Sequence, residues 1–357
     1  MAIHIRELSI DQFKGINNLS LRNLGDVNII LGDNNAGKTS ILELLLCMHE
    51  PASLWNIRNA FRSNGLLGTT LFDGMMGLFP VDGELKIRYR FTIDDGEKDI
   101  IINGKIDSNQ VEVKEIYRLN GYTTLEENNK EANWLVDAKC LRVDISINGQ
   151  DSAHYDIFDF LRRTPEDNNG IEFYPSIYIP PAIQNQDFVN LSAVLERPQM
   201  QEKLINILKV YDESISSVQA IKSQYGVDYK IVSNKHKVVV PVSYYGDGMK
   251  KAIELFSAAV FISGGILLID EFETSIHTSA MTDTYRRLME IVKELNVQVF
   301  MTTHSKEALE KLMGLEVLET MDFKVHTVFD EKGKHLVRTL NLQEARKATN
   351  QWGMDLR

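Results

Sequence analysis

The residues best placed to do chemistry begin with an eight-residue loop, Gly32-Asp33-Asn34-Asn35-Ala36-Gly37-Lys38-Thr39. It satisfies the pattern G-x-x-x-x-G-K-[S/T] between an apolar run and a helical segment, which is the context of a phosphate-binding loop. Its glycines let backbone N–H groups turn towards a phosphate, and the next helix adds its positive dipole end. We expect Lys38 to reach the β- and γ-phosphates and the Thr39 hydroxyl to bind Mg²⁺. The residues expected to hold the nucleotide here are Gly32, Asn34, Asn35, Ala36, Gly37, Lys38, Thr39 and Ser40.

Two adjacent carboxylates follow an apolar run later in the chain. Ile266-Leu267-Leu268-Ile269 leads directly into Asp270 and Glu271. A buried parallel strand delivers both acids to the carboxyl edge of a sheet, where ligands bind in open α/β folds. Asp270 is then placed to hold Mg²⁺, and Glu271 to polarise an attacking water. The alternative is a strand that ends in a solvated acidic turn.

A histidine follows the next apolar run. Val297–Met301 is succeeded by Thr302, Thr303 and His304. We expect this strand to end beside the Asp270 strand, so that His304 donates a hydrogen bond to a γ-phosphate or to the water. A lone histidine more often only caps a strand, and that alternative stays open. Its place one helix after the carboxylates favours a catalytic role beside Lys38 and Glu271.

A turn with two glycines, Gly246-Asp247-Gly248, opens a long helical segment. Glycines at a helix N-terminus leave backbone N–H groups free for a second set of phosphate contacts. The alternative is an ordinary turn in which Asp247 lies near the N-cap.

The elements that must position these groups alternate between strands and helices. Strands are expected at Ile3–Ile10, Val27–Leu31, Lys237–Val242, Ile266–Ile269 and Val297–Met301, and helices at Thr39–Met48, Met249–Ser263 and Met281–Leu295. Strands that alternate with crossover helices predict a mainly parallel core sheet.

Residues 51–180 have a different pattern. Segments rich in Val, Ile, Tyr and Phe are separated by turn dipeptides such as Asp95-Gly96, Asn103-Gly104 and Asn120-Gly121, which is typical of hairpins. We predict strands at Glu84–Ile93, Asp99–Ile106 and Val111–Leu119, a helix at Tyr155–Arg163, and helical structure between Leu191 and Ile221. No motif in 51–180 names a ligand.

The expected fold class is therefore α/β, a P-loop nucleoside triphosphatase in one domain, 1–357. Its core lobe is expected at 1–50 and 231–320, an antiparallel β-rich insertion at 51–180, and a helical segment at 187–225.

Composition indicates a soluble, cytoplasmic chain. Hydrophobic residues make up 43% and charged residues 25%, and the net charge of −11 argues against a broad basic surface for nucleic acid. The two cysteines, Cys47 and Cys140, have no metal-ligand spacing and fit a reducing compartment. The N-terminus lacks a signal-peptide pattern, and the longest apolar stretch, Leu255–Ile269, is too short to cross a membrane comfortably.

Together these motifs resemble the ABC ATPase superfamily and occur in its order: phosphate loop, signature turn, Asp-Glu strand, short loop and switch histidine. The resemblance is closest to the RecF/SMC branch, and within it to AAA-family ATPases with OLD-type (overcoming-lysogenization-defect) domains. The further segments that carry it are Asp11–Ile16, Gly246–Lys250 and Asp270–Glu273, the last followed by Ser275 and His277. It implies hydrolysis of ATP with Mg²⁺.

The resemblance also implies a head-to-tail homodimer, because the signature turn of one ABC subunit closes on ATP held by another. Gly246-Asp247-Gly248 stands where the family usually has Ser-Gly-Gly, and Lys250 is the residue expected to offset the charge of Asp247. Lys14 occupies a place where relatives carry a basic residue near the nucleotide. A glutamine usually completes the Mg²⁺ shell, for which Gln184 and Gln186 are the candidates.

Many OLD-like proteins continue into a TOPRIM nuclease domain, and about fifty residues after His304 are too few for one. The chain resembles the stand-alone ATPases of this group, which are often paired with a separate nuclease or toxin in bacterial anti-phage defence. Two alternatives remain open: a RecF-like repair ATPase that binds DNA, and an ATP-gated scaffold in which hydrolysis only resets the complex. No membrane partner is expected.

Overall fold

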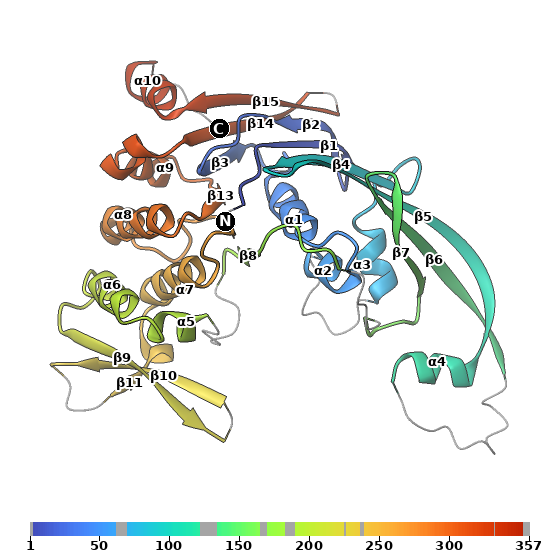
Figure 1. Cartoon of the computed structure of the whole chain (residues 1–357), viewed down its shortest axis with the longest axis horizontal. Coiled ribbons are helices and arrows are strands. Elements are labelled where there is room, and N and C mark those ends of the chain that lie inside the picture. Colours follow the sequence, from blue (N-terminus) through green and yellow to red (C-terminus); the bar gives the residue numbers. More distant parts are fainter. Residues whose placement is uncertain are drawn as a thin grey trace.

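The computed structural model describes a six-stranded mainly parallel sheet, a six-stranded antiparallel sheet and a three-stranded sheet, with helices around them (Figure 1). The described residues are 3–61, 70–121, 134–164, 170–182, 190–224, 226–235, 239–331 and 333–352.

The core sheet has the strand order β15-β14-β3-β13-β12-β8. Its strands are β3 (Val27–Gly32), β8 (Ser176–Ile179), β12 (Ile266–Ile269), β13 (Gln298–Thr302), β14 (Phe323–Glu331) and β15 (Lys334–Asn341). Neighbouring strands from β14 to β8 run parallel, and β15 alone pairs antiparallel. The predicted α/β class with a mainly parallel core sheet is confirmed.

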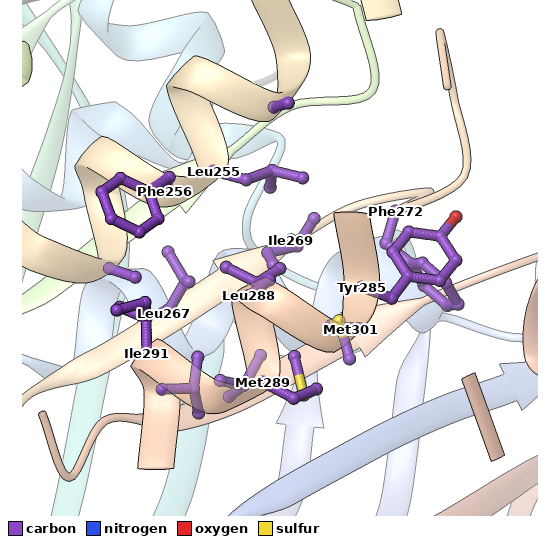
Figure 2. Packing of buried hydrophobic residues seen from close by; sticks show 14 of the residues in the cluster. Leu255, Phe256, Leu267, Ile269, Phe272, Tyr285, Leu288, Met289, Ile291 and Met301 are labelled. Carbon is purple, nitrogen blue, oxygen red and sulfur yellow. The ribbon is translucent and has the colours of Figure 1, made fainter. Parts of the chain in front are cut away.

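Both faces of this sheet are buried, because successive side chains of a strand point to opposite sides. Leu267 and Ile269 of β12 lie in one hydrophobic core, whereas Ile266 and Leu268 lie in a second. Helices on the first side are α5 (Leu191–Leu195), α6 (Pro198–Leu208), α7 (Asp247–Phe261), α8 (Thr278–Glu294), α9 (Lys306–Met313) and α10 (Leu342–Trp352). Figure 2 shows side chains of α7, β12 and α8 meeting in this first core.

The second core lies between the parallel sheet and the antiparallel sheet, with α1 (Lys38–Met48) inside it (Figure 1). The antiparallel order is β2-β1-β4-β5-β6-β7. Its strands are β1 (Glu7–Phe13), β2 (Ile16–Leu21), β4 (Lys86–Ile93), β5 (Gly96–Glu112), β6 (Leu135–Ile147) and β7 (Gln150–Phe158). The helices α2 (Leu54–Asn59) and α3 (Leu71–Met76) contribute side chains to the same core.

Several predicted elements of the antiparallel section are wrong. Asn103-Gly104 lies inside β5, which continues to Glu112 because it pairs along its length with β6. The segment predicted as a strand at Val111–Leu119 is instead mostly helix α4 (Val113–Leu119). The helix predicted at Tyr155–Arg163 is replaced up to Phe158 by β7, which pairs with β6.

The predicted helical segment 187–225 is helical only in α5 and α6. From Ile215 it forms β9 (Ile215–Ser223), which pairs with β10 (Gly226–Ser233) in the three-stranded sheet β11-β10-β9. The strand predicted at Lys237–Val242 is reduced to β11 (Val240–Pro241) within the described residues, and residues 236–238 lie outside them. A short 3₁₀ helix, η2 (Val242–Tyr244), leads to α7, and η3 (Glu316–Thr320) follows α9.

The two large sheets do not follow the residue ranges predicted for the core lobe and the insertion. β1 and β2 belong to the antiparallel sheet although they precede residue 50, whereas β8, β14 and β15 belong to the core sheet. Among the described residues, no helix is both long and apolar enough to cross a membrane.

Candidate nucleotide site

The phosphate loop joins β3 to α1 as predicted. Gly32 has a φ of +147°, and a Cβ there would lie 2.4 Å from the carbonyl oxygen of Val328. Gly37 has a φ of +90°, and a Cβ there would come within 3.0 Å of Ile16. Only glycine fits these positions without displacing neighbours, so the two motif glycines set the path of the loop.

Lys38 begins α1 and is 6% exposed. Its ammonium donates hydrogen bonds to the carbonyl oxygens of Gly32 at 2.8 Å and Asp33 at 2.9 Å. Burial lowers the pKa of Lys38, and the nearby carboxylates, chiefly Asp270, act against that shift. The cation is therefore held at the loop, where a phosphate would stabilise its charged form.

Thr39 and Asp270 meet although they are far apart in sequence. The Thr39 hydroxyl donates to Asp270 Oδ2 at 3.0 Å, and the Tyr178 hydroxyl donates to the same oxygen at 3.2 Å. Thr302 donates to the other carboxylate oxygen. The described residues contain no cluster of three His, Cys, Asp or Glu side chains that could enclose a metal. Two protein oxygens suit Mg²⁺, which usually keeps several waters and takes further ligands from substrate phosphates.

Glu271 has a left-handed backbone conformation, with a φ of +45°. Its N–H donates to the Thr302 hydroxyl at 2.8 Å, and its Oε2 accepts from the Thr274 hydroxyl at 3.2 Å. Positive φ is unusual for glutamate, and such strain is found preferentially at functional sites. The Thr302 contact fixes this conformation at the edge of the sheet.

His304 is exposed and lies on the same pocket as Lys38 and Thr39. Its backbone N–H donates to Glu273 Oε1 at 3.0 Å. The other oxygen of Glu273 is buried and has no hydrogen-bond partner among the described residues. The segment after the two carboxylates therefore holds the backbone of the predicted switch histidine.

Lys38, Thr39 and His304 border one cavity of about 830 Å³, and Asp270 lies behind Thr39, whose hydroxyl donates to it. Lys14 also lines it, but its ammonium pairs with Glu43 at 2.6 Å and donates to the Ala60 carbonyl oxygen at 3.2 Å. Phe61, Leu78 and His335 line the pocket as well. The sequence analysis did not single out these last three side chains.

The predicted signature turn lies on a second cavity, of about 670 Å³. Gly246 and Gly248 line it together with Ser275 and His277. Asp247 begins α7 and is paired with Lys250 at 3.1 Å, so the expected charge compensation is present. A Cβ at Gly248 would lie 3.0 Å from the Ser275 carbonyl oxygen, whereas Gly246 has nothing within 4 Å of that position.

The structure thus brings the phosphate loop, Asp270 and His304 together and sets the glycine turn at another pocket. Gln184 and Gln186, the predicted Mg²⁺ glutamines, lie outside the described residues. Tyr178 and Glu273 support the site without having been predicted to do so. No sequence signal marks either contact, because each depends on the register of neighbouring strands and loops.

Known proteins resemble this chain over most of its length. The family model described as "AAA domain, putative AbiEii toxin, Type IV TA system" matches residues 27–310. An ATP/GTP phosphatase of Helicobacter pylori is 27% identical over 351 residues, covering 90% of each chain. An uncharacterised protein of Methanocaldococcus jannaschii is 31% identical over 113 residues, which are 31% of this chain and 98% of that protein.

Solved structures give more distant matches. The SMC head domain of Thermotoga maritima has a TM-score of 0.45 and 13% identity, covering 94% of this chain and 99% of that one. RecF with ATP has a TM-score of 0.46 and 14% identity, covering 95% and 98%.

Proposed function

Because this chain belongs to the AAA-domain family described as a type IV toxin–antitoxin protein and is a P-loop ATPase, we propose that it hydrolyses ATP between two copies of itself. The observation that carries the proposal is the separation of two half-sites in one chain. The phosphate loop borders the first cavity, and the Gly246–Gly248 turn borders the second. In a head-to-tail pair each turn faces the loop of the other copy, and the two contacts close symmetrically.

The proposed roles follow from the side chains at the first cavity and from the two carboxylates that follow β12. Lys38 and the loop N–H groups bind the phosphates, while Thr39 and Asp270 hold Mg²⁺, which neutralises phosphate charge. Glu271 accepts the proton of the attacking water. His304 lies on the same cavity, in position to donate a hydrogen bond to the γ-phosphate. The bound base is adenine in this proposal, and the name of the Helicobacter relative supports a test of GTP as well.

Mixing two inactive variants tests the shared site. Lys38→Ala removes the phosphate contact of its own subunit. Gly246→Leu places a side chain on the face of the turn, where the free subunit has open space. Each variant alone is expected to lose ATPase activity. In a mixture, a heterodimer keeps one site with an intact loop and an intact turn, so activity should reappear although each variant alone is inactive. Random pairing of equal amounts would give about a quarter of the unchanged level, and preferential formation of the heterodimer would give up to about half.

The same mixture distinguishes the proposal from hydrolysis within one subunit. If Gly246→Leu alone keeps full activity at all protein concentrations, or if the mixture stays inactive, the head-to-tail site is wrong. Glu271→Gln should accumulate as an ATP-bound dimer in size-exclusion chromatography, whereas Lys38→Ala should stay monomeric.

We further propose that the closed dimer controls a separate effector, such as a nuclease or toxin, in anti-phage defence. The toxin–antitoxin description of the family supports this, and so do the exposed apolar side chains of Trp134, directly before β6, and Leu135, its first residue. Strands β5 and β6 project away from the core sheet (Figure 1). Association of purified candidate effectors with Glu271→Gln, measured with and without ATP, tests it. Salt-dependent, ATP-dependent binding to duplex DNA without effector binding would instead favour the RecF-like alternative.

A further inference from the structure

We propose that the apolar wall formed by Ile16, Phe61 and Leu78 in the first cavity is the subsite for the nucleotide base. The inference rests on the proposed function, because it takes the phosphates of the same molecule to lie at the loop 32–39. It assigns binding roles to Phe61 and Leu78, which lie in no motif of the sequence, and to Ile16, the last residue of the segment Asp11–Ile16.

The cavity is lined by two chemically different sets of side chains. One set is polar and includes Lys38, Thr39 and Ser40 at the phosphate loop, with Asp73 and His335 elsewhere in the lining. The other set is apolar and consists of Ile16, Phe61 and Leu78. Ile16 packs directly on the loop, since a Cβ at Gly37 would approach it to 3.0 Å. A nucleotide whose phosphates lie at the loop 32–39 would bring its base towards this wall, and the volume of about 830 Å³ accommodates such a ligand.

Packing and backbone hydrogen bonds hold the side chains of the wall in place. The ring of Phe61 packs on the backbone of α3 so closely that a Cβ at Gly74 would lie 2.2 Å from it. The backbone N–H of Lys14 donates to the Leu78 carbonyl oxygen at 2.9 Å. Ile16, Phe61 and Leu78 are 1%, 7% and 2% exposed, so Phe61 offers most of the apolar surface that a base could contact. Side chains that are already ordered lose little conformational entropy when a ligand binds.

Lys14 supports the wall. Its ammonium bridges Glu43 at 2.6 Å and the Ala60 carbonyl oxygen at 3.2 Å, directly before Phe61 in the chain. We assign it as a positioning residue for Phe61. An aromatic and aliphatic wall holds a planar ring by packing and does not read its hydrogen-bonding edge, so adenine and guanine should bind with similar affinity.

Kinetics with a base-free competitor test this subsite. Phe61→Leu is expected to raise KM for ATP and GTP about three- to tenfold with kcat unchanged, because aromatic packing is lost while the phosphate contacts stay. The inhibition constant of inorganic tripolyphosphate, which has no base, should not change. Phe72→Leu is the matched control, since Phe72 is similarly buried, at 8% exposed, in α3 but does not line the cavity.

The outcomes separate the two proposals. An unchanged KM in Phe61→Leu, or an equal weakening of tripolyphosphate, overturns the base subsite alone. Turnover that survives Lys38→Ala overturns the proposed function and the subsite with it. Photolabelling the unchanged protein with 8-azido-ATP needs no variant: label on peptides that contain Ile16, Phe61 or Leu78 supports the assignment, and label confined to other peptides overturns it.

Discussion

Glu273 holds the backbone of His304, with 3.0 Å between its Oε1 and the histidine N–H. The two residues come from loops that follow neighbouring parallel strands, β12 and β13. Glu273 lies two residues after Glu271 and two before Ser275, which contacts the glycine turn. The segment 271–277 therefore contributes Ser275 and His277 to the second cavity and holds the backbone of His304, which lines the first.

Removing this contact should lower turnover more than nucleotide binding. Glu273→Ala is expected to reduce kcat about tenfold with little change in KM, because a hydrogen bond to a charged group contributes about 1.5–3 kcal/mol. Glu273→Gln keeps an acceptor oxygen and should retain most of the activity. Equal losses in the two variants, measured by steady-state ATPase assays, would show that the carboxylate acts in another way.

Tyr178 should increase the affinity of the site for Mg²⁺. Tyr178→Phe removes the hydroxyl that donates to Asp270, and loss of such an outer contact typically weakens metal affinity about tenfold or more. The Mg²⁺ activation curve should shift to higher concentration with kcat at saturation preserved. Tyr174→Phe is the control, because its hydroxyl donates to the Leu45 carbonyl oxygen instead. Superimposable curves for Tyr178→Phe and the unchanged protein would contradict the assigned role.

Replacing Gly32 by alanine should destabilise the fold, whereas replacing Gly246 by alanine should not. Gly32→Ala forces a Cβ against the Val328 carbonyl oxygen at a φ of +147°, so the free energy of unfolding should fall by about 1–3 kcal/mol. Gly246→Ala meets open space and should leave thermal unfolding almost unchanged. Comparable melting temperatures for the two variants would refute this account of the loop.

His326 should make the fold sensitive to acid. Burial lowers its pKa to about 4, with a smaller contribution from Lys324. Its unfolded pKa is about 6.5, so the unfolded state binds the proton more tightly. The stability that neutral His326 contributes is complete above about pH 6.5 and is lost as pH falls towards 4, at no more than about 1.4 kcal/mol per pH unit. Chemical denaturation should show a shallower pH dependence for His326→Gln between pH 4 and 6.5, and parallel curves would exclude this histidine as the cause.

The parts of the site that depend on a short stretch of sequence could be predicted. The phosphate loop and the Asp270 strand each combine a short apolar run with adjacent polar residues, and tertiary pairing did not alter them. β9 was not predictable in the same way. Ile215, Val218 and Ile221 recur every three residues as on a helix, but pairing with β10 determines their structure.

The fixed packing of β12 and β13 on both faces has a consequence for turnover. A shift of either strand would disrupt two hydrophobic cores at once. We therefore expect the sheet edge that carries Asp270 and Thr302 to keep its position. Within one subunit, we therefore expect movement during an ATP cycle in the loops that follow these strands. The segment 271–277 holds His304 at the first cavity and lines the second with Ser275 and His277, so it connects the two cavities physically.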